Sequence, residues 1–404
     1  MSQVKNARRP YIYELDLLRV VTMLTVIAVH ITGISAASIN TTTAGLQAQN
    51  AVVNLLHVNR SIFMFISAFA LVYVYYGKPV QTIQFWKKRS LGILLPYVVW
   101  SFLYEIFKLP HDVPWPIFFR VLAVDTLTGQ ASFQLYFILI SIQFYIIFPF
   151  FLALMKKVAR HPWITLLTSF TLQVVYLYAD YHTVQMGRIP LVGFWHYYAR
   201  YAERCILSYQ FYFVLGGITA IYFPQVRAFL LRHGRVVVSC AVIAVATFTL
   251  HYIIQVRIYH EPIPHASAVT QPMMAFYSPC IIFFLFWLAS RWTINTSPQQ
   301  PPRAFKFWHT LSDTSFGVYL CHAFMLTVAL SWLIPAMPTS WPVALRVFLG
   351  WLFIASISVS FCLVLLRIPV LSRLIGREAP KKATPPPENK SLATPNRDVV
   401  KLGA

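Results

Sequence analysis

The sequence predicts an all-helical polytopic membrane protein with about ten transmembrane helices and both termini in the cytoplasm. Of its 404 residues, 58% are hydrophobic and 11% are charged, whereas an average soluble domain has roughly 25% charged residues. Apolar runs of about 20 residues recur along the chain, and a helix needs this length to cross a hydrocarbon layer about 30 Å thick. A soluble core has no room for so much apolar surface, so the composition indicates a chain that is embedded in a bilayer.

Ten apolar runs are the candidates for transmembrane helices. They cover residues 12–35, 60–76, 90–107, 133–155, 163–180, 207–224, 236–256, 271–289, 313–334 and 342–366. The outer connections between them are too short for a separate soluble domain. We therefore expect a cytoplasmic N-terminus at residues 1–11 and a single transmembrane domain at residues 12–370. Residues 371–404 are rich in Pro, Lys and small polar residues, which predicts a disordered cytoplasmic tail.

Basic residues are distributed unevenly over the connections. The formal net charge is +21. With a cytoplasmic N-terminus, the inner connections and the tail carry 24 Lys and Arg residues and the outer connections carry seven, while Arg19 and Arg60 lie within the spans. The positive-inside rule then places both termini in the cytoplasm, and we expect the protein in the plasma membrane. The basic excess is therefore a topology signal, and we expect no nucleic acid partner.

Two other readings of the sequence are disfavoured. The first apolar run, 12–35, is too long and too often interrupted by polar residues to be a cleaved signal peptide, so it should remain as a helix. The five cysteines stand singly within or beside apolar runs, with neither CxxC nor CxxH spacing. We therefore expect no disulfide framework and no metal site.

The first apolar run carries three ionisable residues, Asp16, Arg19 and His30. An ionisable side chain near the bilayer centre costs about 3 kcal/mol or more. Arg19 and His30 are 11 positions apart, which is three helical turns plus about 20°, so both lie on one face, separated by roughly 16 Å along the axis. Asp16 lies one turn before Arg19 and can pair with it. These residues should face the bundle interior, where they could mark the inner mouth and the mid-membrane end of a path.

Spacing alone leaves a plainer interpretation open. Arg19 could extend to the inner headgroups with Asp16 as its partner, while His30 forms a hydrogen bond with a neighbouring helix. Between the two ends the same face presents Met23 and Val26, with Thr22 at its edge. The stripe is therefore mostly apolar between its ionisable ends, and by itself it does not describe a polar channel.

Several stretches in series resemble the membrane acyltransferase family three. "LDLLRVVTMLTVIAVH" is similar to its first-helix signature, an arginine followed after ten residues by a histidine. "RSIFMFISAFALVYVYY" resembles its second span, although Ala68 stands where the family usually has glycine. Similar stretches follow in the family's order: the basic loop and proline-containing helix "FWKKRSLGILLPYVVWS", the run "FQLYFILISIQFYIIFPFF" found in polysaccharide-modifying members of the intercellular adhesin type, and the late helix "LSDTSFGVYLCHAFML". The resemblance covers roughly residues 12–370.

The resemblance implies transfer of an acyl group, usually acetyl or succinyl, from cytoplasmic acyl-CoA to a hydroxyl of an extracytoplasmic glycan. Acyl-CoA would be a donor substrate, and no bound cofactor is expected. An alcohol needs a base to take its proton, and histidine titrates near the operating pH. We therefore predict that His30 is the general base, either for direct attack or through a transient acyl-histidine. Arg19 would hold a phosphate or the thioester end of the donor, with Asp16 orienting it.

Further candidates for donor or substrate binding each have a plainer alternative. Arg60, at the start of the second span, could contact the acceptor or the acyl carbonyl, or could anchor the helix at the headgroups. Arg89, nearest the span in the cluster Lys87, Lys88 and Arg89, could bind CoA phosphates, although the positive-inside rule explains the cluster equally well. Tyr319 and His322, one turn apart in the ninth run, could both point into the bundle, or His322 could form only an interhelical hydrogen bond.

Two candidates lie toward the outer side. Glu105 comes three residues before Lys108, and a local ion pair is the more economical interpretation. The outer connection "DYHTVQMGRIPLVGFWHYYARYAER" carries six aromatic residues, of which Trp195 is the most plausible member of a sugar-binding platform. Interfacial aromatic belts have the same composition, so this platform and a belt remain alternatives.

Two other classes of function remain open beside acyl transfer. A transporter or flippase for a glycan or lipid-linked sugar would use the same buried polar groups along a conduit. Such proteins are often built from paired halves with helices interrupted by Gly and Pro, whereas no paired halves are visible and the chain has only 14 Gly. The third class is an assembly partner of the polysaccharide synthesis machinery without chemistry of its own.

Overall fold

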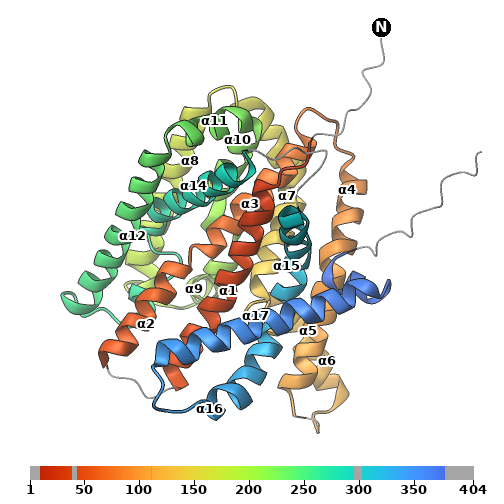
Figure 1. Cartoon of the computed structure of the whole chain (residues 1–404), viewed down its shortest axis with the longest axis vertical. Coiled ribbons are helices and arrows are strands. Elements are labelled where there is room, and N and C mark those ends of the chain that lie inside the picture. Colours follow the sequence, from red (N-terminus) through yellow and green to blue (C-terminus); the bar gives the residue numbers. More distant parts are fainter. Residues whose placement is uncertain (1–9, 39–42, 111, 295–302, 378–404) are drawn as a thin grey trace, which may run out of the picture.

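The computed structural model describes residues 10–38, 43–110, 112–294 and 303–377, and within them it contains helices and no strand (Figure 1). This confirms the all-helical class. The predicted N-terminal segment 1–11 lies almost wholly outside the described residues. Of the tail predicted to be disordered, residues 371–377 are described. They include the short helix η6 (Leu371–Ile375), in which Ser372 and Ile375 are buried.

The first seven α-helices supply four of the long spans. They are α1 (Glu14–Ser38), α2 (Thr43–Leu56), α3 (Asn59–Tyr75), α4 (Thr82–Arg89), α5 (Leu95–Lys108), α6 (Trp115–Thr128) and α7 (Tyr136–Val158). Helices α2 and α3 form one 33-residue unit, and a π-helical turn, η1 (Ser90–Leu94), joins α4 to α5. The second unit therefore begins well before residue 60, where the apolar run predicted its start. The reason is that Gln47, Gln49 and Asn54 make α2 less apolar.

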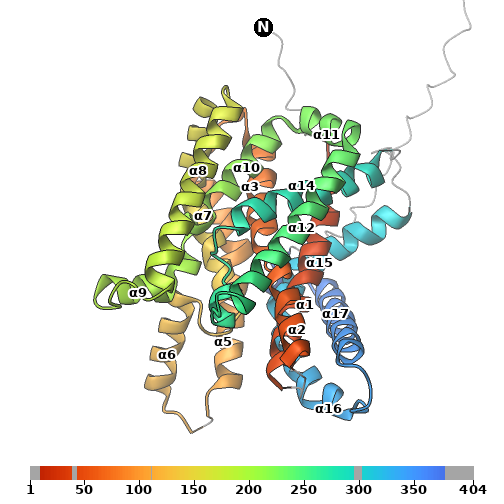
Figure 2. The same cartoon turned by 90° about the vertical axis from the view of Figure 1, so that its left-hand side faces the viewer.

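The remaining α-helices complete the bundle. They are α8 (Pro162–Asp180), α9 (Phe194–Tyr201), α10 (Gln210–Ile221), α11 (Phe223–Arg232), α12 (Gly234–Arg257), α13 (Ile263–Ala266), α14 (Met274–Thr293), α15 (Arg303–Val328), α16 (Ile334–Ala336) and α17 (Val343–Arg367). Short irregular helices connect several of them, among them η2 (Tyr181–Gln185), η3 (Ala202–Arg204), η4 (Ile206–Tyr209) and η5 (Ala329–Leu333). Figure 2 shows α9 projecting from the side of the bundle, away from α17.

Hydrogen bonds define two opposite ends of the bundle. At the first, here called the Glu14 end, Glu14 accepts hydrogen bonds from Arg227 of α11 and Thr293 of α14, both at 2.8 Å. At the second, called the Asp180 end, Tyr181 donates to Glu261 after α12 (2.8 Å). Helix α1 starts at the Glu14 end and runs toward the opposite end, whereas α17 lies across the bundle at a steep angle to α1 (Figure 1). Helices α12 and α14 pack against each other.

The number of membrane crossings depends on α8 and α10. Eight helices are long and apolar enough to cross a membrane, and the bent α9–α10 pair, with an angle of 42°, would make nine. Helix α8 falls outside this set because its polar residues lower its hydropathy. Ser169 donates to Gln210 (2.8 Å) and Gln173 donates to the backbone carbonyl of Ser208 (2.8 Å). These bonds place α8 alongside the α10 segment. Each of the ten segments predicted from the sequence is helical, including α8.

The two ends of the described chain meet the same helix. Before α1, the Tyr11 hydroxyl lies 3.1 Å from His309 of α15, and after α17, Arg377 pairs with Asp313 of α15 at 2.5 Å. His309 and Asp313 are one helical turn apart. Both chain ends therefore lie at the Glu14 end, which requires an even number of crossings. That this end faces the cytoplasm stays a prediction from the distribution of basic residues.

Helix α3 occupies the centre of one core, and its tight contact with α10 fixes its position. A Cβ atom on Gly216 would collide with the backbone oxygen of Phe65, so only glycine allows this approach. Phe65 and Phe69 are fully buried between the two helices and α14. The rigid packing of α3 holds Arg60, at its start, near the ends of α7 and α10.

Candidate active site

Two histidines from distant parts of the chain meet in the bundle. His30 of α1 stacks on His322 of α15, with ring centroids 5.4 Å apart and an interplanar angle of 25°. Phe133, just before α7, packs against His30 at 4.5 Å. The structure thus brings together two histidines that the sequence separates by almost 300 residues. Their rings share one site within the bundle.

The hydrogen bonds of His322 determine which of its nitrogens is free. Its Nδ1 lies 2.8 Å from the carbonyl oxygen of Tyr319 and 3.2 Å from that of Val318. Carbonyl oxygens only accept, so Nδ1 carries the proton and Nε2 keeps its lone pair. That Nε2 is buried and has no hydrogen-bond partner. A buried nitrogen without a partner is costly unless a ligand group completes it, so His322 presents an acceptor for a hydroxyl proton.

The segment 133–137, at the start of α7, contacts both His30 of α1 and Tyr319 of α15. Besides Phe133, it supplies Gln134, whose backbone carbonyl accepts a hydrogen bond from the hydroxyl of Tyr319. The side-chain Nε2 of Gln134 is buried without a partner. Phe137 packs against Tyr319, with ring centroids 5.9 Å apart. The stretch "FQLYF" therefore lies at the junction between α1, α7 and α15.

Arg60 faces this junction from α3. Its guanidinium lies 5.3 Å above the ring of Tyr136 and forms an ion pair with Glu203 of η3 at 3.3 Å. The side chain of Arg60 is 18% exposed, and its charge is among those close enough to act on His30. Burial of a cation beside a histidine pair suits a group that stabilises negative charge on a bound ligand. The structure thus holds Arg60 between Tyr136 and Glu203, with its charge within electrostatic range of His30.

Asp16 is the buried centre of a second polar cluster, at the Glu14 end. Its carboxylate accepts hydrogen bonds from Tyr11 (2.7 Å) and Ser312 (2.8 Å), and it lies 3.0 Å from Nδ1 of His309. Burial, reinforced by the neighbouring carboxylate, raises the pKa of the Tyr11 phenol, which therefore remains a donor. Arg19 approaches the same carboxylate at 3.4 Å. Asp16 is thus held by several donors and pairs with Arg19, one turn away, while its role in orienting Arg19 stays a prediction.

A cavity of about 300 Å³ opens beside Arg19. The residues that line it come from the start of α1 and the end of α3, and they include Tyr11, Tyr73 and Lys78. Arg19 remains 31% exposed, so a ligand in this cavity can reach its guanidinium. Two cations among the lining residues, Arg19 and Lys78, make the cavity suitable for an anionic group.

Arg89 lies close to the same region. Its guanidinium stacks on the rings of Phe85 (5.7 Å) and Tyr145 (5.6 Å). Tyr145 is within electrostatic range of both Arg89 and Arg19. The Nε of Arg89 is buried and has no hydrogen-bond partner. Arg89 therefore stacks on a tyrosine whose hydroxyl also lies within electrostatic range of Arg19.

The face of α1 between Arg19 and His30 is packed. Thr22 and Met23 are both buried, and Thr22 donates to the backbone carbonyl of Leu18. A substrate arm that reaches from the Arg19 cavity to His30, over roughly 16 Å, therefore has to displace these side chains. Met23 is suited to this, because an unbranched thioether side chain adapts to different neighbours.

Two predicted site residues lie apart from the histidine pair. Glu105 is fully buried and pairs with Lys108 at 3.1 Å, and Lys108 also pairs with Asp125 of α6 at 2.6 Å. This agrees with the local ion pair favoured by the sequence. Trp195 of α9 is 38% exposed and packs against the rings of Phe194 and Tyr198. Neither residue contributes to the histidine site.

Sequence reasoning missed several residues of the site. Glu203 and Tyr136 flank Arg60, and Gln134 presents an unpartnered amide nitrogen. Gln134 and Tyr136 lie in a stretch that resembles the family, but no feature of that stretch singles them out as site residues. Glu203 was the most detectable, because it is one of only 12 acidic residues in the chain and precedes the 207–224 span. Among the described residues, no group of three His, Cys, Asp or Glu side chains is placed to hold a metal ion.

The comparisons with known proteins identify the family. Residues 12–367 match the acyltransferase domain that defines acyltransferase family 3. A search of curated proteins and a search of solved structures found no match. The matched region extends from just before α1 to the end of α17 and contains both histidines as well as Asp16 and Arg19. The chain therefore belongs to acyltransferase family 3 and is a multi-pass membrane acyltransferase.

Proposed function

We propose that the protein transfers an acyl group, acetyl or succinyl, from cytoplasmic acyl-CoA to a hydroxyl of an extracytoplasmic glycan or exopolysaccharide in the plasma membrane. The observation that carries the proposal is the position of the histidine pair. It lies inside the bundle, between a cation-lined cavity at the Glu14 end and Arg60 near the Asp180 end. Family membership supports the reaction class, while donor and acceptor are inferred from the charges.

Donor binding would take place at the Glu14 end. Arg19 would hold a phosphate or the thioester end of acyl-CoA, with Asp16 fixing its orientation. Arg89 supplies a second cation near Tyr145. Because CoA carries several phosphates and a long flexible arm, the headgroup can remain near these cations while the thioester extends along α1. The positive charge of the Glu14 end also agrees with access from the cytoplasm.

Chemistry would take place at His30. In direct transfer, the imidazole takes the proton of the acceptor hydroxyl, and the oxygen attacks the thioester carbonyl. The new carbon–oxygen bond forms, the carbon–sulfur bond breaks, and the CoA thiolate takes the proton back from the imidazolium. Arg60 and the unpartnered side-chain Nε2 of Gln134 are candidates to stabilise the oxyanion, and His322 Nε2 can accept a hydrogen bond from a second hydroxyl group. A transient acyl-histidine on His30 uses the same groups in two steps.

Purified protein in nanodiscs provides the test of this donor chemistry. Given acetyl-CoA or succinyl-CoA labelled in the acyl group, the protein should release free CoA through slow hydrolysis in the absence of acceptor. A transporter or an assembly partner is not expected to hydrolyse the thioester of acyl-CoA. If neither donor loses its acyl group above the rate with empty nanodiscs, acyl-CoA is not the donor and the proposal is wrong. The chain's possible association with polysaccharide synthesis machinery does not affect this readout.

A further inference from the structure

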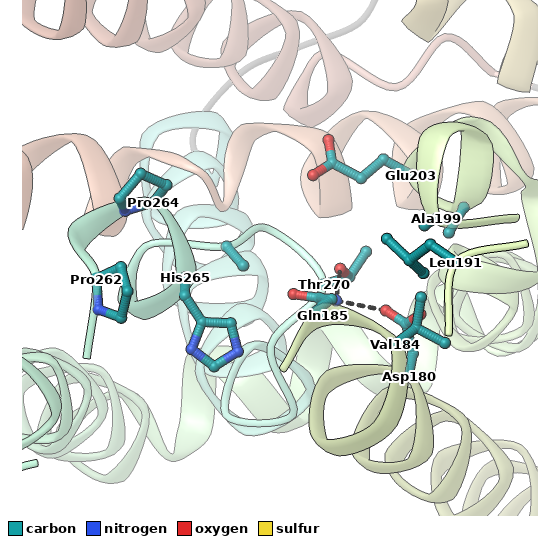
Figure 3. Close-up of a pocket in the computed structure, with 12 residues that line it drawn as sticks. Asp180, Val184, Gln185, Leu191, Ala199, Glu203, Pro262, Pro264, His265 and Thr270 are labelled. Atoms are coloured by element: carbon teal, nitrogen blue, oxygen red, sulfur yellow. Dashed lines mark hydrogen bonds between the residues drawn. The ribbon is translucent and has the colours of Figure 1, made fainter. Parts of the chain in front are cut away.

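A second cavity, of about 470 Å³, opens at the Asp180 end of the bundle (Figure 3). Its walls come from the end of α8, η2, the α9–η3 segment and the loop around α13. Asp180, Gln185, Thr270 and Glu203 surround its centre, with His265 on the far side. The volume falls within the range of small-molecule sites. None of the described residues that line this cavity, here called the Asp180 cavity, is Lys or Arg.

Asp180 lines the cavity but is buried from bulk solvent. The residue is only 4% exposed. One carboxylate oxygen, Oδ2, accepts a hydrogen bond from Gln185, whereas Oδ1 is buried without a partner. The nearby Tyr198 hydroxyl donates its proton elsewhere, to Tyr176 at 3.0 Å. One oxygen of this buried carboxylate therefore lacks a hydrogen-bond donor among the described residues, and a donor group on a ligand in the cavity would satisfy it.

The opposite wall is held in place by Glu261. Its Oε2 accepts hydrogen bonds from Tyr181 (2.8 Å) and Gln255 (3.1 Å) and lies 3.1 Å from Nδ1 of His265. The ring of His265 stacks on Tyr181, with centroids 4.1 Å apart. His265 Nε2 is buried without a partner. Because Glu261 fixes the ring, this nitrogen offers a second hydrogen-bonding position with a defined direction.

Glu203 connects the Asp180 cavity to the histidine site. It lines the cavity from η3, and its carboxylate pairs with Arg60 at 3.3 Å. Arg60 in turn is close enough to His30 for their charges to interact. A ligand that contacts Glu203 in the Asp180 cavity therefore lies next to the ion pair between Glu203 and Arg60.

We propose that the Asp180 cavity is the subsite for one sugar unit of the acceptor, and that it accepts neutral or amine-bearing sugars and rejects sugars that carry a carboxylate or phosphate. Hydroxyl and ammonium groups donate hydrogen bonds, as Asp180 and Glu203 require. An anionic sugar would bring like charges together in a partly desolvated site, where repulsion is strong. This inference rests on the proposed function for the nature of the acceptor, and it adds the charge selectivity.

Binding of tetrasaccharide probes tests the selectivity. Tetramers of glucose, glucosamine and glucuronic acid are titrated into the full-length protein in nanodiscs, and binding is followed by calorimetry. We expect the glucosamine and glucose tetramers to bind and the glucuronic acid tetramer to bind at least tenfold more weakly. Asp180→Asn retains the size of the side chain but loses its charge, so glucosamine binding should weaken roughly tenfold or more.

The matched control is Asp112→Asn, which alters an exposed aspartate outside the cavity and should leave all three affinities unchanged. Glu203→Gln provides a second cavity variant with the same expected direction if Asp180→Asn fails to fold. Equal affinity for glucuronic acid and glucosamine, parent-like binding by folded Asp180→Asn and Glu203→Gln, or no binding of any tetramer would each overturn the subsite. Acyl-CoA hydrolysis without acceptor is measured in the same samples. Its persistence when the tetramer result is negative shows that only the subsite assignment failed.

Discussion

Replacing His30 by Ala is expected to reduce acyl transfer by about 10²- to 10⁴-fold, which corresponds to about 3 to 5 kcal/mol of transition-state stabilisation. The imidazole stacks on His322, and its charge interacts with that of Arg60. Its removal introduces no charge, so the protein should still insert and fold. The measurement is the rate of transfer of labelled acyl groups by purified protein in nanodiscs, with folding checked by size exclusion.

The control for this change is His161→Ala, which removes an exposed histidine at the connection between α7 and α8 and should leave the rate unchanged. A second variant, His322→Ala, should reduce the rate less than His30→Ala, since His322 can assist but its Nδ1 is committed to backbone carbonyls. Near-normal transfer by folded His30→Ala protein would exclude His30 as the base. A larger loss in His322→Ala than in His30→Ala would move that role to His322.

Replacing Arg19 by Lys is expected to weaken acyl-CoA binding by roughly 10- to 100-fold. Lysine retains the charge but loses the planar fork that holds phosphate or carboxylate in a bidentate manner. A hydrogen bond to a charged group contributes about 1.5–3 kcal/mol, and the cavity beside Arg19 is where the donor would lose it. Asp16→Asn should have a milder effect, because Tyr11 and Ser312 still find an acceptor at that position. Acyl-CoA binding by calorimetry measures both.

The matched control is Arg232→Lys, an exposed arginine of α11 at the Glu14 end, which should bind donor as the parent does. This control separates the bidentate role of Arg19 from the general positive charge of this end. If Arg19→Lys binds and turns over the donor as the parent does, Arg19 is only a charge anchor. The face of α1 would then provide no path for the donor, and the case for this helix would depend on His30 alone.

The sequence predicted the helices better than their contacts. Each of the ten predicted apolar runs is helical in the structure, because the requirement for internally satisfied backbone groups acts locally. The same signal misses α2, where polar residues such as Asn54 are buried through a hydrogen bond between Gln271 Nε2 and Asn54 Oδ1 (3.0 Å). It also misses the π-helical turns, since these depend on packing and not on composition. Contacts with other helices therefore determine the structure of these segments, which hydropathy alone does not predict.

In the candidate site, too, local contacts could be predicted from the sequence and long-range contacts could not. Asp16 and Arg19 are one helical turn apart, so their contact follows from local geometry, and the structure confirms it at 3.4 Å. The stacking of His30 on His322 and the pairing of Arg60 with Glu203 join residues 292 and 143 positions apart. No periodicity links such positions, and in the sequence each histidine was an isolated polar residue. The resemblance to the acyltransferase family suggested the separate residues, whereas their convergence on one site required coordinates.

Mass spectrometry of surface polysaccharide tests the central claim most directly. Cells that lack the protein are compared with cells that express the parent chain or the His30→Ala variant at equal levels, and acyl groups on glycan hydroxyls are counted per sugar unit. Acyl groups should be present only with the parent chain, while the amount of surface polysaccharide should be the same in all three. Equal acylation in all three would contradict acyl transfer by this protein. Loss of surface polysaccharide with unchanged acylation of the remainder would indicate glycan transport instead.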